Sequence, residues 1–280
     1  MNLPVTDNEL VIRLGFFFGV LTIMAIWELF APRRKLSTSK TGRWTNNLSL
    51  VIVNSILLRL IFPVTAVGVA LIAAERQWGL LNNAGLPVWL AVIMAVVMLD
   101  LVIYLQHVIF HAVPTLWRLH MVHHTDLDID VTTGNRFHPL EIILSMLIKM
   151  AAVTVIGPPV MAVIIFEVVL NATSMFNHSN VRLPKPVDRV LRLFIVTPDM
   201  HRVHHSVIKR ETNSNYGFNL PWWDRMFGTY RDQPAAGHIA MTIGLEQYRD
   251  PAQLTLPRLF ILPATGKPGS YPINRDEEEK

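Results

Sequence analysis

In this 280-residue chain the histidines are the residues whose number and spacing indicate a chemical role. Eleven are present, and eight fall into three clusters: His107-x3-His111, His120-x2-His123-His124 and His201-x2-His204-His205. Residues at positions i, i+3 and i+4 of a helix lie close to one face, so each cluster can direct at least two imidazoles at one point. Neutral imidazole binds iron, zinc and copper. Eight ring nitrogens exceed what one ion binds, and the pattern predicts a site for two metal ions.

A polar stripe leads into the first cluster. Asp100, Tyr104, His107 and His111 stand at positions i, i+4, i+7 and i+11, which is one helical face. Asp100 lies nearly two turns of about 5.4 Å from His107, so we do not expect it to bind the same ion. We expect Asp100 or Tyr104 to hydrogen-bond an imidazole and fix its tautomer, which makes both candidate catalytic residues. A polar contact between helices is the alternative.

The elements that position these residues are expected to lie in a membrane. Apolar residues make up 51% of the chain and charged residues 16%, whereas soluble domains carry about 25% charged residues. There are no cysteines, which excludes disulfides, thiolate-held iron–sulfur clusters and zinc sites of the cysteine type. The net charge of +4 does not indicate nucleic-acid binding, because the basic residues flank apolar segments and no RNA-binding motif is present.

A helix of about 20 apolar residues can cross a bilayer. The chain has four apolar blocks that reach this length. Three of them, 11–31, 48–74 and 86–110, predict membrane spans. The fourth, 140–176, is interrupted at Gly157-Pro158-Pro159. Its two arms of roughly 17 residues predict a hairpin that returns to the side it came from, with two full spans as the alternative. The first block is followed by Arg33, Arg34 and Lys35 instead of a cleavage site, so we expect no cleaved signal peptide.

The basic residues between the first two spans predict the orientation. Five of them stand in this loop, whereas Glu75 and Arg76 are the only charges in the second loop. The positive-inside rule places the first loop, and with it all three histidine clusters, in the cytoplasm. The predicted fold class is therefore all-α, a polytopic membrane helical bundle with a cytoplasmic histidine-rich helical cap. We divide it into N-terminal transmembrane helices (1–85), a catalytic domain (86–235) and a cytoplasmic C-terminal tail (236–280).

Between about Asp100 and Tyr230 the sequence resembles the fatty acid hydroxylase / sterol desaturase superfamily of membrane-bound di-iron oxygenases. The order H-x3-H, H-x2-H-H, apolar hairpin, H-x2-H-H is that of the superfamily, and the phrases WRLHMVHHTD, PDMHRVHH, NYGF and WDRMFGTY agree with it. The resemblance implies that the eight clustered histidines bind two iron ions. It also implies that His178, in Asn177-His-Ser-Asn180 after the hairpin, is an additional ligand.

The other polar residues near the clusters are assigned less specific roles. His138, at the start of the hairpin, is expected to support a ligand or to begin a helix, and whether it binds metal stays open. His238 is expected to be structural or exposed. Asp126, Asp128 and Asp130 could orient imidazoles, but we expect at least two of them to lie in a solvated acidic turn.

By resemblance, the function is hydroxylation or desaturation of a C–H bond of a lipid, with O2 as co-substrate. The chain has no flavin or nucleotide fingerprint, so electrons are expected from a separate protein, a ferredoxin or a cytochrome b5-like donor with its reductase. The lipid is expected to enter from the bilayer, with Trp117, Phe176 and Met200 as candidate lining residues. Short loops favour a bacterial inner membrane, with the active site facing the cytoplasm.

Three other classes of protein also use histidines. A membrane zinc hydrolase is expected to carry H-E-x-x-H, which this chain lacks. A metal-binding or transport protein would place histidines near mid-membrane, whereas these stand at one end of the spans. A two-heme cytochrome needs one axial histidine on each facing helix instead of contiguous pairs.

Overall fold

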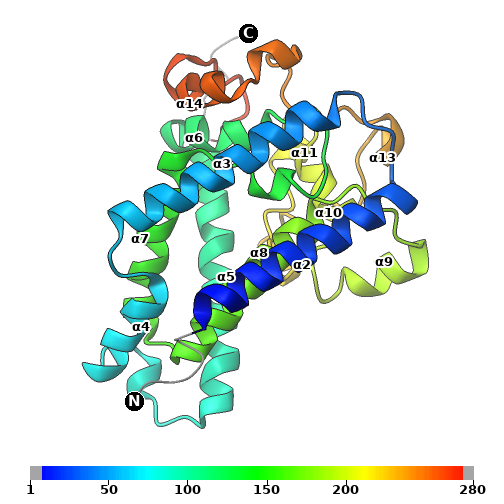
Figure 1. Cartoon of the computed structure of the whole chain (residues 1–280). Helices are drawn as coiled ribbons and strands as arrows, with labels where there is room; N and C mark the ends of the chain where they lie inside the picture. Colours follow the sequence, from blue (N-terminus) through cyan, green and yellow to red (C-terminus); the bar gives the residue numbers. More distant parts are fainter. Residues whose placement is uncertain (1–7, 274–280) are drawn as a thin grey trace.

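The protein is built from helices in the computed structural model, which describes residues 8–273 (Figure 1). Over this range no residue belongs to an extended strand, and the β-pairing consists of two isolated bridges, Pro32–Val181 and Ser206–Ile243. The predicted all-α class is confirmed.

Five helical stretches are long and apolar enough to cross a membrane, so the chain is an integral membrane protein. They are α2 (Glu9–Phe30), α3 with α4 (Lys40–Ile61 and Ala66–Glu75), α5 (Val88–Ala112), α7 (Pro139–Ile156) and α8 (Val160–Asn177). The interrupted block is confirmed as a pair of 18-residue helices.

The second span is not the continuous helix expected over 48–74. α3 ends at Ile61 and α4 begins at Ala66. Pro63 lies between them; it has no N–H to donate and disfavours a helical conformation in the residue before it. Thr65 then caps α4, where its side chain accepts a hydrogen bond from Gly68 N.

The turn between α7 and α8 requires glycine. Gly157 has a φ of 62°, in the left-handed region that side chains disfavour. A Cβ atom at Gly157 would also lie 2.4 Å from the carbonyl oxygen of Trp78. The backbones are joined next to this point, where Leu80 N donates to Val155 O at 3.0 Å. The hairpin turn therefore packs directly on the segment that leads into α5.

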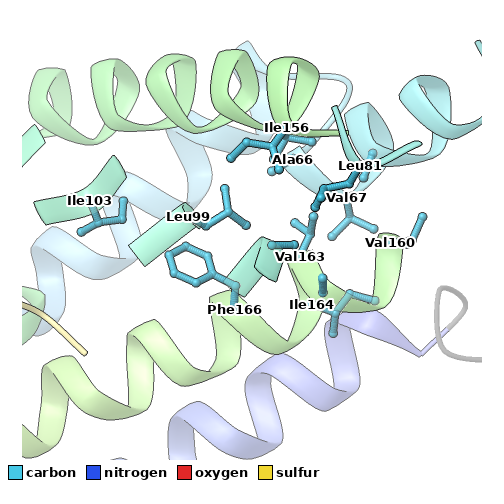
Figure 2. Close-up of a cluster of buried hydrophobic side chains, with 14 of the residues drawn as sticks. Ala66, Val67, Leu81, Leu99, Ile103, Ile156, Val160, Val163, Ile164 and Phe166 are labelled. Atoms are coloured by element: carbon cyan, nitrogen blue, oxygen red, sulfur yellow. The ribbon is translucent and has the colours of Figure 1, made fainter. Parts of the chain in front are cut away.

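An apolar core holds the membrane helices together. Figure 2 shows side chains from α4, α5, α7 and α8 meeting in it, among them Val67, Leu99, Ile156, Val163 and Phe166. On its outside, α2 packs along α8 and α3 along α7. The core fixes the direction of α5 and α8, the two long helices that carry histidines.

The second and third histidine clusters lie in a cap of short helices. Its helices are α6 (Pro114–His124), α9 (Lys185–Leu191), α10 (Pro198–His204), α11 (Lys209–Thr212), α12 (Trp222–Met226), α13 (Gly237–Ala240) and α14 (Leu256–Thr265), with 3-10 turns η1 (Leu81–Asn83), η2 (Thr133–Asn135) and η3 (Pro251–Gln253) elsewhere in the chain. In Figure 1, α6, α11 and α14 lie near one end of α5, and α4 lies near the other.

The expected C-terminal tail is instead a packed part of this cap. Tyr248, Leu259 and Tyr271 are buried in one apolar cluster with Trp117 and Met121 of α6. The tail was expected because the segment is polar in composition, but its apolar residues, among them Leu254, Leu259 and Leu262, are buried. The acidic end expected to be solvated, 275–280, lies outside the described residues.

Three aspartates that follow the second histidine cluster are buried, which corrects the expectation of a solvated acidic turn. Asp126, Asp128 and Asp130 are each 2% exposed or less. Arg43, on α3, bridges Asp126 at 2.5 Å and Asp130 at 2.6 Å. Asp128 accepts hydrogen bonds from the backbone N–H groups of Ser37 and Thr38. The partners come from about 85 residues upstream, so the local sequence gave no sign of them.

These contacts place the basic first loop against the histidine-bearing cap. Arg33, in the same loop, pairs with Asp199 of α10 at 2.9 Å. The loop and the cap therefore lie on one side of the helical bundle.

Replacement of Arg43 by methionine should destabilise the protein strongly. It leaves two buried carboxylates without their cation, a loss of about 3–5 kcal/mol for a buried pair that loses one partner. Thermal unfolding of the detergent-solubilised chain measures this as a lower Tm. The control is Lys35→Met in the same loop, because Lys35 is exposed. An equal Tm for both variants would show that Arg43 does not hold the cap.

Candidate metal centre

Nine buried histidines converge in two groups. The first consists of His107, His111, His120, His124 and His204, and the second of His123, His178, His201 and His205. Within each group one ring nitrogen from every residue lies within 4.8 Å of the others. All nine side chains are buried. The structure thus brings together the eight clustered histidines and His178.

The two groups divide the sequence clusters between them. On α6, His120 and His124 are four residues apart and join the first group, whereas His123 faces the second. On α10 and the residue after it, His204 joins the first group, and His201 and His205 join the second. Both triplets therefore serve both groups. His178 ends α8 and reaches the second group from the membrane hairpin.

Five histidines have a defined tautomer because their Nδ1 atom faces an accepting oxygen, which is a backbone carbonyl, an amide oxygen or, for His120, an ionised carboxylate. The acceptors are Glu141 Oε1 for His120 (2.6 Å), Asn213 Oδ1 for His111 (3.0 Å), and the carbonyl oxygens of Tyr216, Ser174 and Ser214 for His107, His178 and His204 (2.7 Å each). Nδ1 must then donate its proton, which leaves the Nε2 lone pair free. Histidine ligands of metals are commonly held in this way.

One contact in the first group calls for a cation. The Nε2 atoms of His107 and His120 lie 3.1 Å apart. With the Glu141 carboxylate ionised, both residues donate from Nδ1, so in their neutral forms both Nε2 atoms carry lone pairs and neither can donate to the other. Two nitrogens at this separation can both reach one ion at about 2.0–2.1 Å. A bound metal ion resolves the repulsion.

Other ring nitrogens also lack a partner. The Nε2 atoms of His111, His124, His204 and His205 are buried without a hydrogen bond, although buried polar groups are normally paired. Burial lowers the pKa of His120 and of His178 to about 3. Burial, with the neighbouring imidazoles as the next cause, holds the pKa of the cap histidines His123 and His204 well below the usual value. These rings are neutral at pH 7, as metal ligands must be. The donor set therefore fits metal ions.

One short segment supplies three of the five Nδ1 acceptors. Asn213, Ser214 and Tyr216 follow α11. The carboxylate of Asp224 holds this segment, because it accepts hydrogen bonds from the backbone N–H groups of Tyr216 and Gly217 at 2.8 and 2.9 Å. The amide nitrogen of Asn213 donates to Tyr271 O, so its oxygen faces His111.

Sequence reasoning missed two side-chain acceptors. Glu141 is an acidic residue at the start of an apolar helix, and this position could have singled it out. Asn213 stands in polar sequence with no such signal.

Asp100 and Tyr104 do not have the expected contact. Within residues 8–273 neither hydrogen-bonds a histidine. Asp100 accepts from Trp223 Nε1 at 2.8 Å and from Leu220 N at 3.3 Å. The Tyr104 hydroxyl lies 2.9 Å from Thr229 Oγ1. Asp100 and Tyr104, which lie further from the cap than His107 and His111, therefore contact the 213–230 segment and hold it in place.

His138 and His238 lie outside both groups. His138 begins α7, where Nδ1 accepts from Leu140 N and Nε2 donates to Phe260 O. His238 is buried, 3.6 Å from Asp199. Trp117 and Met200, two candidates for the lipid route, are fully buried, and the ring of Trp117 packs on His111.

Fold and site together define an integral membrane protein with a histidine-lined candidate metal centre. Residues 92–229, which contain all nine converging histidines, match the model of the fatty acid hydroxylase family. This match confirms the resemblance noted in the sequence.

Similar proteins act on lipids according to their names. Ornithine lipid hydroxylase OlsE of Rhizobium tropici is 25% identical over 232 residues, which are 78% of this chain and 66% of that protein. Alkylglycerol monooxygenase of Xenopus tropicalis is 30% identical over 45% of this chain and 27% of its own length. The enzyme of Homo sapiens is 26% identical over 57% and 34%. The chain thus spans just under two thirds of the first relative and about a third or less of the others. No solved structure matches the chain.

Glu141→Leu should weaken metal binding, because it removes the acceptor that fixes the His120 tautomer. Loss of such a partner commonly costs about 10–100-fold in metal affinity. Glu141→Gln, which keeps an acceptor oxygen, should lose less. Metal retained per chain during dialysis against increasing chelator measures the effect, with the exposed Glu246→Leu as control. Equal retention by Glu141→Leu and the control would show that Glu141 does not support the site.

Proposed function

We propose that the chain is a membrane-bound, non-heme di-iron oxygenase that hydroxylates or desaturates a C–H bond of a lipid. The observation that carries the proposal is the pair of Nε2 lone pairs of His107 and His120, 3.1 Å apart inside two groups of converging histidines. Two groups support a count of two ions. His107, His111, His120, His124 and His204 would hold one ion, and His123, His178, His201 and His205 the other.

The donor atoms and the relatives together favour iron. Imidazole ligands suit iron, zinc and copper alike, and the names of the relatives include a hydroxylase and a monooxygenase. Bound iron would supply the activation of O2 and the attack on the C–H bond.

The protein's own residues would orient the ligands and keep water out. Glu141, Asn213 and three carbonyl groups hold Nδ1 protons and so direct Nε2 atoms inward. The rings of Trp117 and Phe137 cover His111 and His123, with centroids 4.9 and 4.6 Å away. Asp100 and Tyr104 act through the 213–230 segment and are proposed as positioning residues.

The substrate is proposed to be a membrane lipid that enters from the bilayer. Ornithine lipid and alkylglycerol, named for the relatives, combine an alkyl chain with a polar end, and we propose a substrate of that class. Electrons would come from a separate ferredoxin or a cytochrome b5-like protein with its reductase. The catalytic unit is proposed to be 86–235, which follows the transmembrane helices of 1–85.

The centre is proposed to face the cytoplasm of a bacterial inner membrane. The basic loop after α2 contacts the cap through Arg33, and Arg43 in the first turn of α3 contacts it as well. Any orientation that obeys the positive-inside rule therefore places the cap in the cytoplasm as well.

The neighbouring histidines His123 and His124 of α6 should bind different ions. After anaerobic loading with ferrous iron, His123→Ala and His124→Ala should each retain one ion per chain where the unmodified chain retains two. The double variant should retain none, because one ligand is lost from each group. His238→Ala, outside both groups, is the control. Iron per chain is measured by mass spectrometry of the desalted protein. Equal retention by His124→Ala and the unmodified chain would contradict the assignment.

The oxygenase itself is tested by turnover. The iron-loaded chain in lipid, with a ferredoxin and its reductase, should consume O2 and produce a hydroxylated or desaturated lipid detectable by mass spectrometry. The double variant His123→Ala/His124→Ala should do neither. Lipid hydrolysis, or activity with zinc alone, would contradict the proposal.

Single cysteines test the orientation, since the natural chain has none. Lys35→Cys and Gln253→Cys are exposed on the cap side, and Ala84→Cys is exposed between α4 and α5. In intact cells a membrane-impermeant maleimide should label only Ala84→Cys. Labelling of Lys35→Cys and Gln253→Cys in intact cells would show that the cap faces the outside.

A further inference from the structure

The cap exposes one continuous set of large apolar side chains that the metal centre does not use. Its members come from α9 with the following turn and from α12: Val187, Val190, Leu193, Phe194, Trp222, Met226 and Phe227. We call this set the α9–α12 patch. Phe194 is 57% exposed and Met226 67%. Exposed apolar patches that are contiguous and edged by polar residues mark interaction sites.

Hydrogen bonds make the patch one surface. The indole nitrogen of Trp222 donates to Leu193 O at 2.7 Å, and Arg225 donates to Arg192 O at 3.2 Å. The two segments are therefore joined, although about thirty residues separate them in the sequence.

The patch continues onto a membrane span. The ring of Phe227 stacks on that of Tyr104 of α5, with centroids 5.5 Å apart and an angle of 19° between the rings. The neighbouring α5 residues Leu105 and Ile109 are exposed. Figure 1 shows α9 at the edge of the molecule, running across the direction of α5. A helix in this position can lie in the plane of the bilayer that α5 crosses.

The depth along α5 agrees with an interfacial position. Trp89, 65% exposed in the first turn of α5, marks the opposite interface, where tryptophan is enriched. Tyr104 stands fifteen positions further along the helix, or about 22 Å. In a hydrocarbon core about 30 Å thick, Phe227 would then lie about 8 Å inside the cap-side edge. Helices that lie in the interface insert their apolar faces by about 5–10 Å.

The charges beside the patch suit an anionic surface. Arg182, Lys185 and Arg189 are exposed and have no ion pair within the described range. The acidic Asp188 on the same helix pairs with Arg192. Basic side chains near an interface are attracted to anionic headgroups.

We propose that the α9–α12 patch is a membrane anchor: α9 and the Trp222–Phe227 segment insert into the cap-side leaflet, and Arg182, Lys185 and Arg189 bind its anionic headgroups. The anchor sets the depth of the metal centre, because His107 is only three positions beyond Tyr104 on α5, about 4.5 Å along the helix. This proposal concerns contact with the bilayer and does not depend on the chemistry at the histidines.

The test uses single cysteines at Val190, Phe194 and Met226 in the full chain, labelled with bimane and reconstituted in phosphatidylcholine vesicles with phosphatidylglycerol. Ile93→Cys on the exposed face of α5 is the lipid-facing control, and Gln253→Cys is the aqueous control. Lipids brominated on the acyl chains should quench the three patch labels as they quench Ile93, and iodide should quench only Gln253. No metal is needed for this readout.

Two outcomes overturn the anchor. Quenching of the patch labels by iodide as at Gln253 would place the patch in water, and protection from both quenchers would make it a protein–protein interface. The headgroup contact is tested by Arg182→Gln/Lys185→Gln/Arg189→Gln. Omission of phosphatidylglycerol should reduce bromolipid quenching at Phe194→Cys in the otherwise unmodified chain, and this dependence should be lost in the triple variant. A dependence retained in the triple variant contradicts the role of these residues.

Discussion

The rest of the structure depends on the mutual repulsion of imidazole lone pairs buried at short distance. With the Glu141 carboxylate ionised, His107 and His120 cannot hydrogen-bond each other, because both donate from Nδ1. Without a cation this arrangement would be costly, as it is for other buried polar groups without partners. The surrounding protein must therefore hold the rings in place and leave room for an ion, and much of the cap is organised for that task.

The cap meets this requirement with buried polar contacts that join distant parts of the chain. The side chain of Arg136 donates to Val122 O and Thr125 Oγ1 and so holds the end of α6. Arg43 ties the following segment to α3, and the 213–216 segment supplies acceptors to three histidines. Removal of one partner from such a network leaves a charge or a polar group buried alone. The membrane helices contribute rigidity and three of the nine converging histidines, and the cap contributes the other six.

Local patterns in the sequence were enough to predict the helical class, the spans and the hairpin, because apolar runs and the Gly157-Pro158-Pro159 break act over short distances. The helical spacing of the clusters identified eight of the nine converging histidines, and the family resemblance added His178. The division of His123 and His124 between two groups could not be predicted, since it depends on where α8 and α10 lie relative to α6. The burial of Asp126, Asp128 and Asp130 and the packing of α14 likewise depend on partners far away in the sequence.

The central claim is that two ions occupy the two histidine groups. Anomalous scattering at the iron absorption edge from crystals of the iron-loaded chain tests it most directly. Two peaks are expected, one among His107, His111, His120, His124 and His204 and one among His123, His178, His201 and His205. A single peak, or peaks away from these residues, would contradict it.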